Sequence, residues 1–514
     1  MHLPIKRLTR EGPTPKMFFA PCSLRSKESF NPPSCLDASL EVRFMVQLLI
    51  TRRSLGVATL FLFLLMAVPS IAQAPAEPLR EQLLNGLRIL IWPRPGSQEL
   101  IIKLRLHSGA AFDLAGKAGA MSLLGDILFP DQATVEFFTD EMGGKLDVDT
   151  DLNSITITMK GRASEFERIV EILRNALVTT QITPEIVSRH RDRRIKIVRE
   201  TTVSPASVAD RAIATRLFGD YPYGRPAGGS VEDLARVERA DLMLARERFL
   251  NPNNATLAIV GGVERNRTMR ALRQLLGSWR KSEQIAPATF RRAEPPNTPT
   301  LIINGPADQT AEVRLAVRGV ARADADCVAA SALAVVARQR WLTLSPELAV
   351  KPAFVRHDGH VLPGMFVIGA SINSKSTADI IATAKKVFDS LVKNAVTPGE
   401  LDQARNELIL QLNNRLANPE TMLDVWLDLD TFRLATVEEQ IQSVQKLSAA
   451  DLQRVANRLF KDAPIASIVL GDSQQLKAAV DGHIQVEVMG EIVKPTPAAP
   501  EPKPAIKPNT TSKP

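Results

Sequence analysis

The sequence predicts an α+β fold made of two topologically similar α/β-sandwich domains. Short apolar segments with the alternation of β-strands are interspersed with longer segments whose apolar residues recur every three or four positions, as in helices. The same order of segments begins again after a polar, proline-containing linker at residues 281–299. The 514-residue chain therefore contains two parts of about 200 residues, a usual size for a domain.

The first predicted domain covers residues 75–280. Its predicted strands are 87–92, 100–107, 154–160 and 255–260, and its predicted helices are 118–129, 163–177 and 184–199. The strands alternate or are continuously apolar, and the first two helices have apolar residues at helical spacing, whereas the third helix is strongly charged. Gly143-Gly144 predicts a turn before the third strand, and Gly261-Gly262 ends the fourth.

The second predicted domain covers residues 300–493 and repeats this order in outline. Its predicted strands are 300–304, 312–317, 365–372 and 466–470, and its predicted helices are 325–337, 378–394 and 398–416. The first of these helices is long and rich in alanine and valine.

Residues 45–74 have the three parts of a secretory signal peptide. Arg52 and Arg53 form the charged region, residues 55–68 the apolar core, and Ala72-Gln73-Ala74 the small-residue cleavage site. We therefore expect an exported protein of the bacterial periplasm. An uncleaved signal, the alternative, would leave a membrane anchor.

The two ends of the chain are predicted to lie outside the fold. The extension 1–44 precedes the signal peptide, so we expect translation to begin at Met45. The tail 494–514 holds seven prolines and four lysines without apolar periodicity, which is typical of a disordered segment. Both Cys22 and Cys35 lie in the extension, so the product keeps no cysteine pair for an internal disulfide.

Net charge argues against nucleic acid as a partner. The whole chain carries a formal charge of +8. This excess lies in the two ends, because residues 75–493 contain 51 Lys and Arg against 51 Asp and Glu. A neutral folded part does not form a general polyanion-binding surface.

The segment from Gly116 to Phe129, G-K-A-G-A-M-S-L-L-G-D-I-L-F, resembles the G-x-x-G-x-A-H-x-x-E-H-M-L-F helix of the pitrilysin/insulinase/mitochondrial-processing-peptidase family. The segments 217–229 and 249–263 are also similar to family motifs, L-F-G-x-H-P-L-G-R-P-x-x-G and Y-Y-x-P-x-N-x-x-L-x-x-x-G-x-V. The resemblance extends over about residues 80–490. It implies a chain that forms half of a clamshell peptidase.

The resemblance also implies that the zinc site of the inverzincins is degenerate here. On a helix, H-x-x-E-H directs two imidazoles toward one zinc ion, with the glutamate as general base. Ser122, Gly125 and Asp126 occupy these three positions. Glu200 occupies the position of the downstream ligand, so the remaining site would hold at most Asp126 and Glu200. The plain alternative is an amphipathic helix with no function beyond its core contacts.

The family usually supplies an arginine and a tyrosine to the substrate from its second domain. By alignment, Thr343 and Val350 occupy these positions, so the substrate-binding residues are degenerate as well. His357 and His360 form a short pair in a predicted loop, which is more typical of solvated histidines than of metal ligands.

These patterns favour a non-catalytic subunit that pairs with a catalytic homologue carrying H-x-x-E-H, forms one wall of a chamber and binds peptides or unfolded polypeptides. No cofactor is expected. One alternative is a weak metallopeptidase that holds zinc through Asp126 and Glu200. The other is an independent peptide-binding scaffold.

Overall fold

The computed structural model describes residues 77–201, 204–283, 290, 293–305, 308–480, 484–488 and 491–493. The predicted extension, signal peptide and tail lie outside these residues. Within them, no helix combines the length and the apolar character that crossing a bilayer requires.

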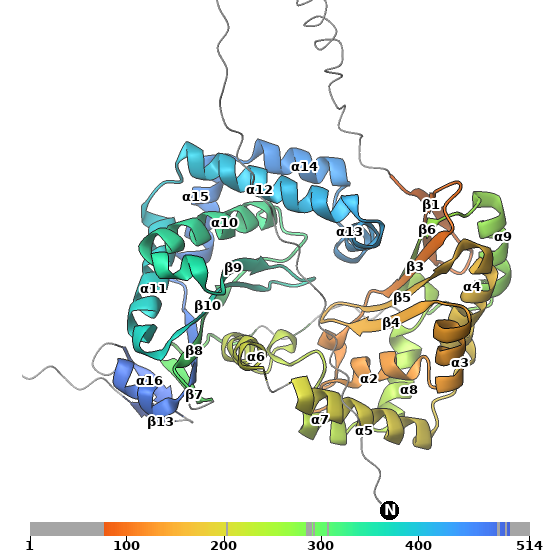
Figure 1. Cartoon of the computed structure of the whole chain (residues 1–514), viewed down its shortest axis with the longest axis horizontal. Coiled ribbons are helices and arrows are strands. Elements are labelled where there is room, and N and C mark those ends of the chain that lie inside the picture. The colour runs from red at the N-terminus through yellow and green to blue at the C-terminus, as the bar shows by residue number, and fades with distance from the viewer. Residues whose placement is uncertain are drawn as a thin grey trace, which may run out of the picture. The chain divides into compact units, whose positions relative to one another are not determined.

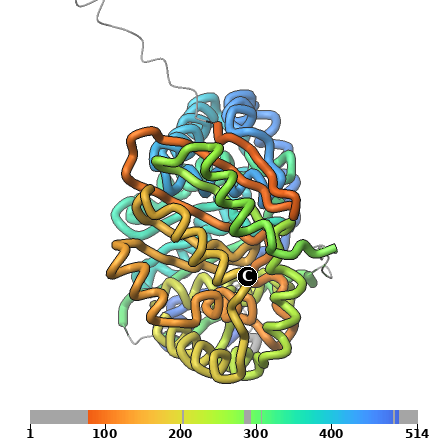
Figure 2. Tube along the Cα trace, turned by 90° about the vertical axis from the view of Figure 1, so that its right-hand side faces the viewer, coloured from red at the N-terminus to blue at the C-terminus, as the bar shows by residue number. Residues whose placement is uncertain are grey.

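The described strands of the first half form a six-stranded sheet in the order β1-β2-β6-β3-β5-β4. The strands are β1 (Leu79–Gln82), β2 (Arg88–Pro93), β3 (Glu99–Leu106), β4 (Lys145–Thr150), β5 (Ile155–Arg162) and β6 (Ala255–Gly261). Strands β2 and β6 pair in parallel although more than 160 residues separate them, with Arg88 opposite Thr256 (Figure 2). The other pairs are antiparallel, and β4 is the edge strand beside β5.

Helices of the first half lie along this sheet and around it (Figure 1). They are α2 (Ala120–Ile127), α3 (Gln132–Glu136), α4 (Phe166–Arg174), α5 (Pro184–Thr201), α6 (Pro205–Phe218), α7 (Val231–Ala235), α8 (Arg239–Phe249) and α9 (Arg265–Leu276). Short helical turns are η1 (Ala110–Phe112), η2 (Phe137–Glu141), η3 (Ala163–Glu165), η4 (Asn175–Thr179), η5 (Pro222–Gly224) and η6 (Pro252–Asn254). Apolar residues of α2, α4 and α9 pack on one face of the sheet and form a buried core with it.

The described strands of the second half form a seven-stranded sheet in the order β13-β12-β7-β11-β8-β10-β9. They are β7 (Thr300–Asn304), β8 (Thr310–Arg318), β9 (Ala353–Asp358), β10 (Met365–Asn373), β11 (Ala466–Gly471), β12 (Val486–Val488) and β13 (Glu491–Val493). The order β7-β11-β8-β10-β9 repeats β2-β6-β3-β5-β4, including the parallel first pair. The predicted α+β class with two topologically similar halves is therefore confirmed.

Helices of the second half lie on one face of this sheet and around it. They are α10 (Cys327–Leu344), α11 (Thr377–Lys393), α12 (Pro398–Ala417), α13 (Pro419–Phe432), α14 (Val437–Lys446), α15 (Ala449–Phe460) and α16 (Ser473–Val480), with the turns η7 (Pro346–Val350) and η8 (Ser374–Ser376). The Ala/Val-rich helix α10 is buried against the sheet and against α11 and α15.

Each half contributes one helix to the other half's sheet. Helix α13 packs on the second face of the first sheet, with the fully buried Trp426 against β2 and β6. Helix α6 packs in the same way on the second face of the other sheet, against β8, β10 and β11. Both sheets are thereby covered on two faces, and the two halves share their cores.

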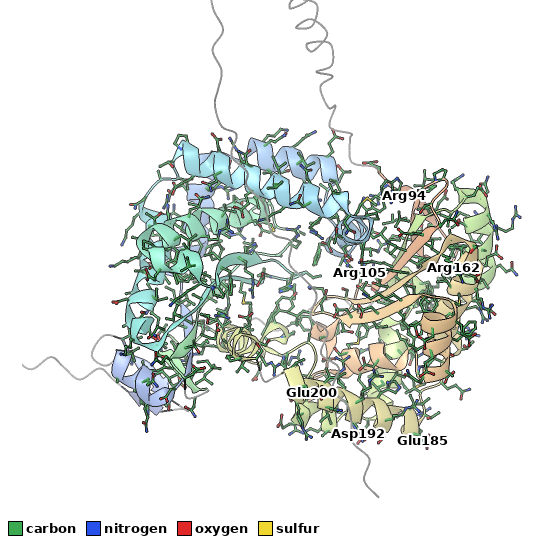
Figure 3. All side chains as sticks on the ribbon, viewed as in Figure 1. Arg94, Arg105, Arg162, Glu185, Asp192 and Glu200 are labelled. Carbon is green, nitrogen blue, oxygen red and sulfur yellow. The ribbon has the colours of Figure 1, made fainter. Side chains whose placement is uncertain are left out.

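Charged side chains on the central strands form ion pairs with the helix that the other half contributes. Lys103 of β3 is buried and donates to Asp424 of α13 at 2.7 Å. Arg105, also on β3 and labelled in Figure 3, pairs with Asp424 at 3.1 Å and with Asp428 at 2.7 Å. In the other half, the buried Arg314 of β8 pairs with Asp210 of α6 at 2.6 Å. The face of β3 that carries cations is therefore buried by acids that lie more than 300 residues away along the chain.

Candidate functional site

The candidate site is built around α2, which carries the degenerate zinc motif. Gly119 precedes the helix with φ of +95°, a left-handed conformation that glycine adopts most easily. The buried carboxylate of Asp113 accepts the first free backbone N–H groups, from Gly119 at 2.6 Å and from Met121 at 2.8 Å. Burial raises the pKa of Asp113 to about 7. These contacts fix where α2 begins.

Ser122 stands at the position of the first imidazole and serves a structural contact. Its side chain is 1% exposed, and its hydroxyl donates a hydrogen bond to the carbonyl oxygen of Ala227 at 2.7 Å. The hydroxyl therefore ties α2 to the loop before α7. The neighbouring Leu123 and Leu124 are buried in the first core, as expected for an amphipathic helix.

Gly125, at the position of the general base, lets α2 approach the edge strand β4. A Cβ atom at this position would lie 3.1 Å from the hydroxyl oxygen of Thr150 and 3.4 Å from a methyl carbon of Val148. Both contacts are with side chains of β4, which would have to shift by a few tenths of an ångström to accept a Cβ atom here. Close packing thus explains a glycine in the middle of this helix.

Asp126, at the position of the second imidazole, is held by an arginine. Its carboxylate accepts two hydrogen bonds from Arg194 of α5, from Nε at 2.6 Å and from Nη2 at 2.5 Å. This two-point contact between a carboxylate and a guanidinium is a strong ion pair. The positive charge beside Asp126 is therefore a guanidinium on a neighbouring helix.

No described contact joins Glu200 to Asp126. Glu200 is 64% exposed, and its ion-pair partner is Lys196, one turn away at 3.9 Å. It follows Arg194 by six residues, about 9 Å along the helix and about 240° around it, so the two side chains leave α5 in different directions. Figure 3 labels Glu200 near the end of α5, after Glu185 and Asp192. The residue of α5 that meets the motif is Arg194.

A cavity of about 420 Å³ opens beside Asp126, between α2, α5 and β4. Arg189, His190 and Arg193 of α5 line it, together with Asp147 of the edge strand. Burial is the main cause that lowers the pKa of His190, and the charge of Arg189 adds to it. This histidine is therefore neutral at pH 7, and the cations of the cavity are the two arginines.

No group of three or more His, Cys, Asp or Glu side chains within the described ranges is placed to hold a metal ion. The six histidines of the sequence stand at positions 2, 107, 190, 357, 360 and 483, and no two of them are four positions apart. The residues that are present fit zinc poorly, because Asp126 is occupied by Arg194 and Ser122 by a carbonyl group.

Thr343 and Val350 lie outside this arrangement. The hydroxyl of Thr343, near the end of α10, donates to the carbonyl oxygen of Gln339 in its own helix at 3.0 Å. Val350 is 89% exposed at the end of the turn η7. Neither side chain has the charge or the aromatic ring that the family supplies to its substrate at these positions.

His357 and His360 do not form a metal pair. His357 lies on β9 rather than in a loop, and its Nε2 accepts a hydrogen bond from the backbone N–H of Val320 at 3.1 Å. His360 contacts Asn153 of the first half through Nδ1 at 2.9 Å, and its ring lies 4.7 Å from that of Tyr223. Burial lowers the pKa of both histidines, of His357 to about 4. His360 therefore lies at a junction between the two halves, which no sequence pattern indicated.

The open edge of β4 is the other feature that sequence reasoning missed. This strand has exposed residues at Lys145, Asp147 and Asp149 and half-buried residues between them. The alternation in Lys-Leu-Asp-Val-Asp-Thr was a signal for a strand with one solvated face. Because β4 ends the sheet next to α2, its free backbone groups lie beside the degenerate motif.

Two sheets with shared helices define the fold of two-domain M16-like peptidases. A structure described as the peptidase M16 inactive domain from Pseudomonas fluorescens has a TM-score of 0.68 at 16% identity, over 77% of this chain and 98% of that chain. Residues 236–408 match the family model of the peptidase M16 inactive domain. An uncharacterized zinc protease of Mycobacterium tuberculosis is 22% identical over 443 residues, 80% of this chain and 99% of that protein.

The mitochondrial-processing peptidase subunit beta of Saccharomyces cerevisiae is 20% identical over 422 residues, 76% of this chain and 90% of that protein. The chain is thus similar to members of the peptidase M16 family, which is the pitrilysin/insulinase/mitochondrial-processing-peptidase family that its motifs resemble. The predicted resemblance is confirmed.

Proposed function

We propose that this protein is a non-catalytic M16 subunit that forms a wall of a peptidase chamber, binds extended peptides and acts with a catalytic homologue carrying H-x-x-E-H. The observation that carries the proposal is the pair between Asp126 and Arg194. A guanidinium that already neutralises this carboxylate competes with a metal cation for the same oxygens. Without zinc the chain has no activated water, so hydrolysis would have to come from another subunit.

The weak-metallopeptidase alternative requires more rearrangement. Arg194 would have to leave Asp126, and Glu200 would have to turn from solvent toward α2. Two carboxylates would then be the protein ligands, whereas catalytic zinc sites use three protein ligands. This alternative is tested directly by the metal content of the protein.

Partnership and export complete the proposal. The yeast relative is named as a subunit of a peptidase, which supports a paired assembly for this chain. The signal peptide at 45–74 would bring the chain to the periplasm, with a mature product that begins close to Pro75. N-terminal sequencing of the exported protein tests this step, and a product that retains residues 60–65 would show an anchor instead.

Zinc content is the first test. We expect the purified chain to hold less than one tenth of an equivalent of zinc, in about the range of a surface-bound trace, because no described site has three ligands. The variant Ser122→His/Gly125→Glu/Asp126→His should also fail to bind zinc tightly, since Arg194 faces the site and Glu200 does not. One equivalent of zinc in the native chain, lost in Glu200→Ala, would support the metallopeptidase instead.

Association is the second test. The chain is purified from its native source under mild conditions, and co-purifying proteins are searched for H-x-x-E-H. We expect such a homologue, with peptide cleavage higher in the presence of this chain than without it. A homologue that is fully active alone and shows no association at micromolar concentration would leave the independent scaffold as the better description.

A further inference from the structure

The cavity beside Asp126 has the properties of a binding site for an anionic group rather than for a metal. We propose that it binds the free C-terminal carboxylate of an extended peptide that ends in an apolar residue. The proposal rests on the proposed function in one respect, the binding of extended peptides, and it names the class of peptide. The apolar walls of the cavity, its charges and the neighbouring strand edge support the proposal.

The walls are apolar and come from four elements around the cavity. They are formed by Phe129, Pro130, Val135, Leu146, Val148 and Ile197. At about 420 Å³ the space is larger than one leucine or phenylalanine side chain, so a terminal residue and its carboxylate both fit. Burying a side chain of this kind away from water is favourable.

The charges of the cavity favour an anion. Arg193 lines it, and the described interactions give its guanidinium no ion pair or hydrogen bond. The hydrogen-bond partner of Arg189 is a backbone carbonyl, that of Pro130 at 2.7 Å. A hydrogen bond from Thr134 and, less strongly, the charge of Arg189 lower the pKa of the exposed Asp131 outside the cavity lining. Of the two lining carboxylates, Asp126 is neutralised by Arg194, which leaves Asp147 against two arginines.

Strand β4 supplies the third element of the site. It ends the sheet, so the backbone N–H and C=O groups along one side of it have no described strand partner. Leu146 and Val148 point from this strand into the wall of the cavity. A peptide that pairs with β4 places every second side chain on that same face.

A C-terminal residue can contact the apolar walls and the arginines of the cavity at the same time. Its side chain takes the apolar walls, and its carboxylate, which is close to the backbone, reaches the guanidinium at the rim. An internal Asp or Glu would fill the apolar space with its own charged group and leave the walls without an apolar partner. The capture of a terminal carboxylate beside a sheet edge is also an established mode of peptide recognition.

The test uses the purified chain and N-terminally labelled hexapeptides of alternating threonine and valine, read by fluorescence anisotropy. The first peptide ends in leucine with a free carboxylate, the second is its amide, the third is an amide with an internal glutamate, and the fourth ends in glycine with a free carboxylate. We expect the first to bind about tenfold or more tightly than each of the others, the effect of one charge-assisted hydrogen bond or of one buried apolar side chain.

Arg193→Gln and Lys196→Gln are matched variants. Both residues are exposed and both variants remove one charge from α5, but Lys196 pairs with Glu200 and does not line the cavity. Arg193→Gln should remove the preference for the free carboxylate over the amide, and Lys196→Gln should keep it. Circular dichroism of both variants confirms that they fold.

The outcomes separate this proposal from the proposed function. Equal binding of acid and amide, a preference that survives Arg193→Gln, or equal binding of the peptide with internal glutamate overturns the proposed carboxylate site. In these three cases the chain still binds extended peptides. Failure of all four peptides to bind at millimolar concentration overturns both the site and the peptide-binding function.

Discussion

Asp424→Ala tests whether the exchanged helix α13 is held by buried charge. Asp424 is the carboxylate paired with Lys103 among the described residues, and it also accepts from Arg105. The side chains of Lys103 and Arg105 are 6% and 9% exposed, so water does not replace the lost partner. Removing one member of a buried ion pair typically costs about 3–5 kcal/mol. Arg105 keeps Asp428, which places the expected loss near the lower value, about 3 kcal/mol.

Urea unfolding followed by tryptophan emission measures this loss. Trp426 of α13 lies 6.0 Å from Trp92 of β2, ring centre to ring centre, so emission reports directly on the docking of the helix. The matched control is Asp389→Ala, which breaks an exposed pair with Lys393. An exposed pair of this kind is worth about 0–1 kcal/mol.

Comparison of Asp424→Ala with Asp389→Ala shows whether buried charge holds α13. If Asp424→Ala shifts the free energy of unfolding no more than Asp389→Ala does, buried charge does not hold α13. The double variant Lys103→Met/Asp424→Leu adds a second check, because replacing both members by apolar groups avoids an unpaired charge. It should recover at least half of the stability that Asp424→Ala loses.

Three further predictions concern pH, a backbone position and the shared core. Burial lowers the pKa of His107 to about 3 and that of His357 to about 4, so both are neutral in the folded chain. Protonation therefore favours the unfolded chain, in which the pKa of histidine is about 6.5. The resulting loss of stability begins below about pH 6.5 and reaches about 2 kcal/mol for each histidine at pH 5. Urea unfolding at pH 7.5 and pH 5 measures this for the native chain and for His107→Gln, which should lose about 2 kcal/mol less than the native chain between these two pH values; an equal loss in both proteins would refute the role of His107. Gly119→Ala places a Cβ 2.8 Å from Cα of Gly229 at positive φ and should lower stability by about 1–3 kcal/mol, so an unchanged thermal midpoint would contradict it. Trp426→Ala should cost about 3–5 kcal/mol through the cavity it leaves, and a loss below about 1 kcal/mol would mean that α13 is not part of the core.

Strand and helix periodicity predicted most of the central strands. The predicted segments 87–92, 100–107, 255–260 and 466–470 correspond to β2, β3, β6 and β11, because a strand that is buried on at least one face has a periodic apolar pattern. The edge strand β9 is half-buried along its whole length and lacks that pattern. For this reason β9 was not predicted, and His357 was assigned to a loop.

The burial of polar positions was beyond sequence reasoning. In β3, the residues Lys103 and Arg105 alternate with apolar ones and have the pattern of a solvated face. The acids that bury this face, Asp424 and Asp428, lie on a helix of the other half. Such pairing depends on contacts between distant parts of the chain, which periodicity within a window does not report.

The sequence predicted the helix of the candidate site but not the contacts of its side chains. Ser122 and Asp126 both lie on the predicted helix α2, and Asp126 lines the cavity. Counting residues leads to Glu200, which is exposed and follows Arg194 by six positions, so the two side chains leave α5 in different directions. No pattern in the sequence pointed to Arg194, which contacts Asp126 from the helix predicted to be strongly charged.

The exchange of α6 and α13 makes the two halves mutually dependent folding units. A half chain expressed alone would expose the buried cations of its central strand together with the sheet face on which its partner's helix packs. Proteolysis in the linker 281–299 should consequently nick the protein without separating it. The two pieces would stay together as a heterodimer, in the manner of two domain-swapped protomers joined by a peptide tether. The linker then acts on assembly through effective concentration, and its loss would weaken reassociation after unfolding much more than it weakens the intact native state.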